Sequence, residues 1–140
     1  MMHTADKVAK VIFACVHNAG RSQMASAFFN ALADPGKARA ISAGTEPADR
    51  VHPEVVETMR EMEIDIAGCV PRKLTAEFGK EAVLLITMGC GDQCPYVPGL
   101  RRADWALPDP KGQPPERVRE IRDDIRARVV ELVKLEGWGA

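Results

Sequence analysis

Cys15 and Arg21 bracket one short polar loop in the segment CVHNAGRS. An apolar run precedes Cys15, and helix-forming residues follow Arg21. If the loop closes as a ring, its backbone N–H groups point inward and are joined by the positive end of the helix dipole, which makes a nest for an anion. A tetrahedral oxyanion fits such a nest, and the planar fork of an arginine can grip two of its oxygens. The predicted oxyanion-binding residues are Val16, His17, Asn18, Ala19, Gly20, Arg21 and Ser22.

The same electric field acts on the sulfur of Cys15. Helix N-termini and nearby cations favour the thiolate, which is the nucleophilic form of cysteine. The hydroxyl of Ser22 can add a hydrogen bond that stabilises the charged sulfur. We therefore predict that Cys15 is a nucleophile rather than a small apolar residue at the end of a strand.

Cys90 and Cys94 follow the most apolar segment of the chain, residues 82–88, which we interpret as a buried strand. Because parallel strands end at one edge of a sheet, these thiols can lie near Cys15. Four residues of extended chain cover roughly 13–14 Å, whereas bridged cysteines need Cα atoms about 4.4–6.8 Å apart, so a Cys90–Cys94 disulfide requires a local bend. The alternatives are unreactive thiols or half of a zinc site, and zinc is disfavoured because no second ligand pair has finger-like spacing. Cys69 has no motif around it and is interpreted as a bystander.

Asp109 lies between Pro108 and Pro110, which stiffen the loop that presents it. A carboxylic acid held near Cys15 can protonate the oxygen that leaves an oxyanion, an effect of about 10²–10⁴-fold in rate. By its residues alone, Asp109 is better interpreted as an ordinary turn residue.

Alternating elements are expected to position these groups. The pattern predicts strands over residues 8–14, 38–43, 82–88 and 103–107, a helix after Arg21, a second helix from Pro53 and a final amphipathic helix over 118–133. Strands and helices that alternate in this way predict an α/β fold with a small parallel sheet covered by helices on both faces.

Composition narrows the function classes. The 140 residues fit a single domain, 1–140, with 46% apolar and 28% charged residues. A formal charge of −1 gives no broad cationic surface for nucleic acid. No apolar run approaches the roughly 20 residues that span a membrane, and the first residues lack a signal-peptide layout. We therefore expect a cytoplasmic protein whose four cysteines are free thiols, metal ligands or catalytic groups rather than structural bridges.

Four landmarks in order resemble the low-molecular-weight tyrosine phosphatase superfamily and, within it, the thioredoxin-coupled arsenate reductases. They are VIFACVHNAGRSQMA, ISAGTEP, TMGCGDQCP and DWALPDPKG, and together they span nearly the whole chain. The resemblance implies a four-stranded parallel sheet with a phosphatase-type P-loop after the first strand. It also implies that Asp109 is the general acid.

The resemblance implies a mechanism as well. Cys15 attacks arsenate held by the P-loop and Arg21, Cys90 then attacks Cys15 as arsenite leaves, and Cys94 moves the disulfide to Cys90–Cys94. No tightly bound cofactor is expected, but an external thiol reductant is: thioredoxin first, with glutaredoxin or a low-molecular-weight thiol as alternatives.

Two other functions stay open at this point. A phosphatase of the same fold needs only Cys15, Arg21 and Asp109, although Lys111 to Gln113 replace the aromatic residues that usually follow the acid in such enzymes. A regulator that senses oxyanions or redox state needs the nest and the thiols without Asp109.

The resemblance further suggests a potassium site at Asn18, Ser42 and Asp65. Ser26 stands where several relatives carry a glutamate ligand for that ion, so this site departs from the pattern of the family.

Overall fold

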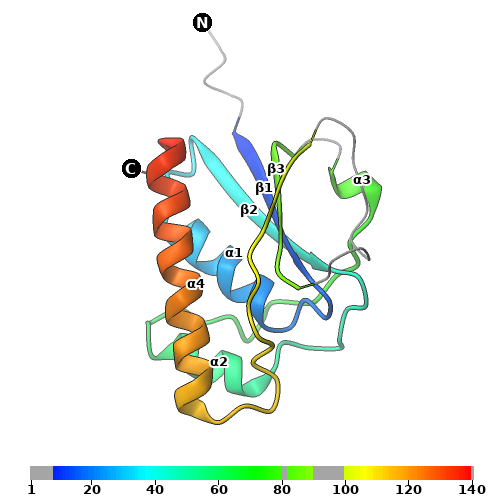
Figure 1. Ribbon diagram of the computed structural model, residues 1–140, viewed down its shortest axis with the longest axis vertical. Helices are drawn as coiled ribbons and strands as arrows, with labels where there is room; N and C mark the ends of the chain where they lie inside the picture. The colour runs from blue at the N-terminus through cyan, green and yellow to red at the C-terminus, as the bar shows by residue number, and fades with distance from the viewer. Residues whose placement is uncertain (1–7, 80–81, 90–99, 140) are drawn as a thin grey trace, which may run out of the picture.

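The computed structural model describes residues 8–79, 82–89 and 100–139 of the chain. Strands and helices alternate along it (Figure 1). In chain order the elements are β1 (Ala9–Cys15), α1 (Arg21–Leu32), β2 (Ala38–Gly44), α2 (Pro53–Arg60), α3 (Ala76–Gly79), β3 (Leu84–Thr87), β4 (Arg101–Asp104) and α4 (Pro115–Glu136).

The described strands form one four-stranded sheet in the order β2-β1-β3-β4, and every pair of neighbours is parallel. The register places Cys15 opposite Gly44 of β2 and Ala14 opposite Thr87 of β3. After β2 the chain crosses β1 to build β3, so the strand order reverses at the carboxyl end of β1. In parallel sheets this reversal opens a crevice that binds ligands. The predicted α/β fold with a parallel sheet is confirmed.

Alternation along β1 divides the core into two layers. Val11 and Phe13 pack under α1, α2 and α4, and the ring of Phe13 lies 5.9 Å from that of Phe29 and 5.6 Å from that of Trp105. Ile12 and Ala14 face the opposite side of the sheet, where α3 lies in Figure 1. Because side chains alternate in a strand, Cys15 shares the face of Val11 and Phe13 and is directed toward the start of α1.

The strand β4 begins and ends earlier than predicted, at residues 101–104 rather than 103–107. Its sequence RRAD is polar because β4 is an edge strand, where arginine side chains reach water and protect the edge from further pairing. The pairing of Leu84 with Arg101 sets its position, and hydrophobicity gives no sign of that pairing.

The helix α4 is longer than the predicted 118–133 and runs to Glu136. It begins after Pro114 and ends at Gly137, whose φ of 73° gives the left-handed C-cap that glycine favours. Its buried stripe repeats at spacings of three and four residues, from Val118 to Val133. None of the described helices is both long and apolar enough to cross a membrane.

Candidate active site

Backbone hydrogen bonds fasten the loop between β1 and α1 to the segment 46–52. The carbonyls of Val16, His17 and Ala19 accept bonds of 2.8–2.9 Å from N–H groups of the segment 46–52. Within the described part of the chain, the N–H groups of residues 16–22 donate to no other group, and no side chain caps α1. The carbonyls of this loop are thus hydrogen-bonded to a neighbouring segment, whereas its N–H groups remain free to donate to a ligand. An oxyanion requires such free donors.

Asn18 fastens this loop from within. It adopts a left-handed φ of 50° and is fully buried. Its Oδ1 accepts the backbone N–H of Arg72 at 3.0 Å and Nε2 of Gln23 at 3.3 Å. Its Nδ2 donates to the hydroxyl of Ser22 at 2.8 Å. The sequence placed Asn18 in the nest, but not at the centre of a buried hydrogen-bond network.

The network ends on the predicted nucleophile, Cys15. The Sγ of Cys15 lies 2.9 Å from Oγ of Ser22, and Cys15 is only 2% exposed. Because an amide nitrogen can only donate, Oγ of Ser22 accepts from Asn18 and keeps its own proton for the sulfur. A hydrogen bond to a charged acceptor is favoured over one to a neutral acceptor, so this chain of donors is suited to a thiolate.

Arg21 joins the loop to the ends of β3 and β4. Its Nη1 donates to the carbonyl of Leu107 at 3.1 Å, and its Nη2 lies 3.9 Å from Oδ2 of Asp109. The side chain of Arg21 is 9% exposed and that of Asp109 is 43% exposed. The structure therefore brings the predicted cation and the predicted acid together, with the carboxyl group open to solvent.

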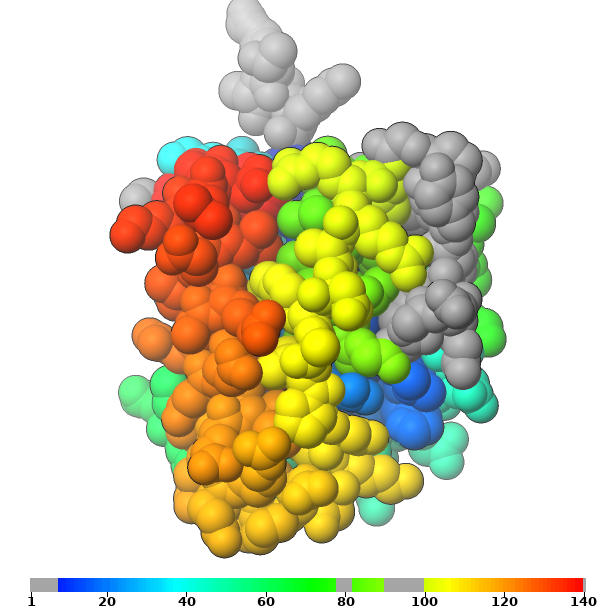
Figure 2. All heavy atoms as spheres, viewed as in Figure 1, coloured from blue at the N-terminus to red at the C-terminus, as the bar shows by residue number. Residues whose placement is uncertain are grey.

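The loop that carries Asp109 packs directly on the P-loop. In the space-filling view the segment after β4, in yellow, descends beside α4 and reaches the blue atoms near the start of the chain (Figure 2). A Cβ at Gly20 would lie 2.9 Å from Cγ of Pro110, so only glycine permits this approach without displacing the proline. Oδ1 of Asp109 accepts the N–H of Lys111 at 3.0 Å, which shapes the turn.

The site also includes two residues that the sequence analysis missed, His52 and Glu54. The ring of His52 lies close to Gly20, at 3.7 Å from the position of an added Cβ. Burial is the main cause of a lowered pKa at His52, against the opposing effect of the charges of Glu54 and Asp109. Glu54 accepts the N–H of Gly112 at 2.8 Å, and this bond is the main cause of its lowered pKa. Glu54 thereby ties α2 to the loop of Asp109.

Two glycines in the site are required by close contacts. A Cβ at Gly44 would lie 2.6 Å from the carbonyl oxygen of Val16 and 2.9 Å from the backbone nitrogen of Asn18. A Cβ at Gly89, whose φ is +104°, would collide with Nη1 of Arg21. Both glycines directly follow predicted strand segments. That position was the only feature of the sequence that could have indicated their place in the site.

The predicted potassium ligands do not form a set of free oxygens. Oδ1 of Asn18 already accepts two hydrogen bonds. Asp65 accepts the N–H of Ala67, and its exposed carboxylate lies 4.0 Å from Nε of Arg60. Ser42 lines a pocket into which Arg72 extends. Hydrogen bonds and an ion pair therefore already involve two of the three predicted potassium ligands, Asn18 and Asp65.

Of the predicted redox cysteines, Cys90 and Cys94 lie outside the described residues. Cys69 is exposed and is a free thiol. Among the described residues, no group of three or more His, Cys, Asp or Glu side chains is arranged to hold a metal ion.

Known proteins resemble this chain over most of its length. A Halobacterium salinarum protein named "Putative arsenate reductase" is 42% identical over 133 residues, which cover 92% of this chain and 94% of that protein. The glutaredoxin arsenate reductase of Synechocystis is 36% identical over 127 residues, which cover 89% of this chain and 95% of the relative.

The fold is similar to that of a thioredoxin-dependent arsenate reductase from Corynebacterium glutamicum, with a TM-score of 0.80 and 41% identity. That match covers 93% of this chain but only 62% of the longer Corynebacterium chain. The sequence pattern of the low molecular weight phosphotyrosine protein phosphatase family matches residues 10–136. Because that match covers most of the chain, the chain belongs to the low molecular weight phosphotyrosine protein phosphatase family.

Proposed function

We propose that this protein is an arsenate reductase that acts through Cys15, Cys90 and Cys94. The observation that carries the proposal is a loop, residues 16–22, whose backbone N–H groups have no acceptor in the described part of the chain and which directly follows a thiol 2.9 Å from Oγ of Ser22. Relatives named as arsenate reductases, which match nearly the full chain, support arsenate as the oxyanion.

The first step is substitution at arsenic. The Cys15 thiolate attacks arsenate held by the loop amides and Arg21, a new S–As bond forms, and one As–O bond breaks. Asp109 gives its proton to the departing oxygen, which leaves as water. The contact of 3.9 Å between Asp109 and Arg21 supports this role, because the same guanidinium binds the oxyanion.

The second step is reduction by thiols. The Cys90 thiolate attacks Sγ of Cys15, the electron pair of the S–As bond passes to arsenic, and arsenite leaves. Cys94 then attacks Cys90, which transfers the disulfide to Cys90–Cys94 and frees Cys15. Ala14 pairs with Thr87, so the segment that leads to Cys90 leaves the sheet at the edge where Cys15 lies. Gly89, the residue before Cys90, lies against the guanidinium of Arg21.

An external dithiol must reduce the Cys90–Cys94 disulfide to complete the cycle. We propose thioredoxin as the donor, because the structurally similar Corynebacterium protein is named as thioredoxin-dependent. Glutaredoxin is the alternative, since the Synechocystis relative is named for it.

The decisive assay is arsenate-dependent NADPH consumption with thioredoxin and thioredoxin reductase. Single serine substitutions at Cys15, Cys90 and Cys94 should each abolish turnover. Cys69→Ser is the matched control, because it removes an exposed thiol outside the relay, and it should keep the wild-type rate.

The same variants separate the alternatives. If serine at Cys90 and at Cys94 leaves turnover unchanged with thioredoxin, glutaredoxin and small thiols, the relay is wrong and phosphate-ester hydrolysis is the better account. Asp109→Asn should slow the enzyme about 10²–10⁴-fold. A regulator without turnover would respond to oxyanions equally well after the Asp109→Asn substitution.

A further inference from the structure

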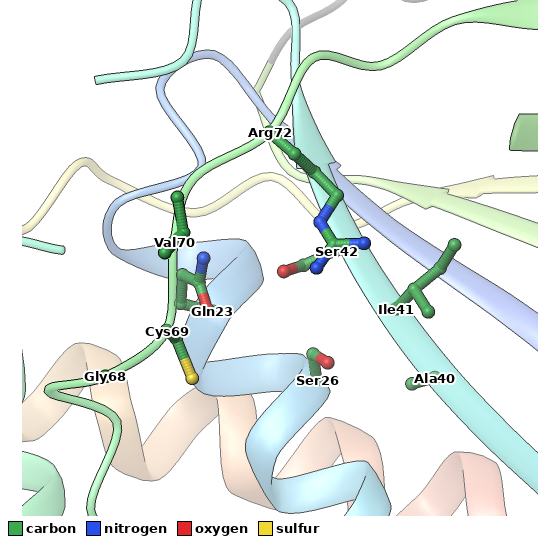
Figure 3. Close-up of a pocket in the computed structure, with 9 residues that line it drawn as sticks. All are labelled: Gln23, Ser26, Ala40, Ile41, Ser42, Gly68, Cys69, Val70 and Arg72. Carbon is green, nitrogen blue, oxygen red and sulfur yellow. The ribbon is translucent and has the colours of Figure 1, made fainter. Parts of the chain in front are cut away.

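A pocket of about 310 Å³ opens between the first turns of α1, the middle of β2 and the loop 68–72 (Figure 3). Its polar lining consists of Gln23, Ser26, Ser42, Cys69 and Arg72. This volume lies at the lower end of the range for pockets that take small molecules. No step of the proposed reduction uses the pocket.

The pocket carries positive charge. Figure 3 shows the side chain of Arg72 extending into the pocket that Ser42 also lines. Within the described part of the chain, no carboxylate lies at ion-pair distance from Arg72, and no acidic side chain lines the pocket. A ligand that enters meets a cation that has no anionic partner of its own.

A buried hydroxyl in the same pocket has no hydrogen-bond partner among the residues that the structure describes. Ser42 is 9% exposed, and its hydroxyl makes no hydrogen bond to any described residue. A buried polar group without a hydrogen bond is costly, so its presence points to a ligand atom or a water that binds it. In a pocket that also holds a guanidinium, the ligand atom that satisfies it best is an anionic oxygen.

A thiol closes the other end of the pocket. The sulfur of Cys69 points away from its own loop toward α1 and Ser26 (Figure 3). Cys69 is exposed and unbridged, so reagents in solution can reach it. The N–H of Cys69 donates to the carbonyl of Ile66 at 3.1 Å, and the N–H of Arg72 donates to Asn18 at 3.0 Å. Both ends of the loop that carries the thiol and the guanidinium are therefore fixed.

We propose that this pocket binds small anionic disulfides and that Cys69 forms a mixed disulfide with them. The carboxylate of the disulfide would bind Arg72 and Ser42, and the thiolate of Cys69 would attack the nearer sulfur of the reagent. The S–S bond of the reagent breaks and a new S–S bond to Sγ forms. The other half leaves as a thiolate and takes a proton from water, so the sulfur of Cys69 is oxidised and the leaving sulfur is reduced.

The test compares two aliphatic disulfides of similar size, the dianionic 3,3′-dithiodipropionate and the neutral bis(2-hydroxyethyl) disulfide. In a variant with serine at Cys15, Cys90 and Cys94, Cys69 is the only thiol. Intact mass spectrometry gives the rate constant of each reaction at one pH, and the anionic-to-neutral ratio is the readout. Any change in the ionised fraction of the thiol cancels in this ratio.

We expect Arg72→Gln to lower the ratio about fivefold, the effect of losing one partly solvated ion pair. Arg126→Gln on the exposed surface of α4 removes the same charge away from the pocket, and it should change the ratio less than twofold. The proposal is wrong if Arg72→Gln leaves the ratio unchanged, or if both substitutions lower it equally.

A second measurement does not depend on the serine variant being folded. The wild-type protein is treated with the same two reagents and digested, and the adduct on the peptide that carries Cys69 is quantified over time. The same preference for the anionic reagent, and its loss in Arg72→Gln, is expected. An adduct at Cys69 with no preference between the reagents would overturn the proposal.

Discussion

Gly89→Ala tests whether the position of Arg21 limits catalysis. Gly89 has a φ of +104°, and an added Cβ would collide with Nη1 of Arg21 and lie 3.3 Å from Cζ. The backbone of Gly89 is fixed by β3, so the guanidinium must give way. Arg21 then loses its 3.1 Å hydrogen bond to the carbonyl of Leu107, and its guanidinium is no longer oriented toward the proposed oxyanion site.

The loss can be estimated from the bonds involved. A hydrogen bond to a charged group contributes about 1.5–3 kcal/mol, and each ~1.4 kcal/mol corresponds to a tenfold change in rate. If one such bond to arsenate is lost in the transition state, kcat/KM for arsenate falls about 10–150-fold. The left-handed backbone adds a cost of roughly 1–3 kcal/mol to folding stability, so a lower melting temperature is expected as well.

Gly137→Ala is the matched control for backbone strain. Gly137 also has a positive φ, +73°, but an added Cβ there meets no atom within 4 Å, and it caps α4 far from the P-loop. It should lower stability without changing kcat/KM. Steady-state kinetics with thioredoxin, measured at a temperature where both variants are folded, decides the question. The reasoning would be refuted if kcat/KM of Gly89→Ala stayed within threefold of the wild-type value, or if Gly137→Ala lowered kcat/KM by the same factor.

Three further predictions rest on local contacts. Hydrogen bonds from Arg119 and Arg122 lower the pKa of Glu61 to about 2, so their stabilisation is complete above pH 4.5 and is lost as the pH falls toward 2. Urea unfolding of Glu61→Gln should therefore show a stability gap to wild type that closes over this interval, and a gap independent of pH would contradict it. Burial lowers the pKa of His52 below 6.5, so just below pH 6.5 the unfolded chain binds more protons than the folded chain. The free energy of unfolding should therefore rise with pH in this range. An NMR titration of the His52 ring with a midpoint above pH 6.5 would contradict this prediction. Gly44→Ala should deform the P-loop and raise the Kd for phosphate, measured by calorimetry, whereas Gly68→Ala, with open space around it, should not.

The sequence was sufficient for the parts of the fold that depend on local patterns. The run that ends at Cys15 is apolar at every position from Val11, and α4 repeats its apolar residues at helical spacing, so both elements were predictable. The displaced β4 was not, because its RRAD segment has no apolar pattern and takes its position from pairing with β3.

In the candidate site, too, the features set by local sequence were predictable and those set by long-range contacts were not. Cys15, Arg21 and Ser22 are close in the chain, so their proximity followed from the loop itself. The close approaches of Gly89 to Arg21 and of Gly20 to Pro110 join segments about 70 to 90 residues apart, and no local pattern reports them. The partners of the predicted potassium ligands were equally hidden, since Oδ1 of Asn18 accepts the N–H of Arg72, a residue 54 positions away.

The fold orders the proposed anion-binding groups before any anion arrives. Arg21 is 7% exposed and bound to the carbonyl of Leu107, so the roughly 2 kcal/mol of rotamer entropy that an arginine carries is lost on folding rather than on binding. The loop amides are oriented in the same way by the carbonyl bonds to segment 46–52 and by Asn18. A substitution that only loosens these supports therefore weakens binding through the cost of reordering the loop, even though every group that touches the oxyanion is still present.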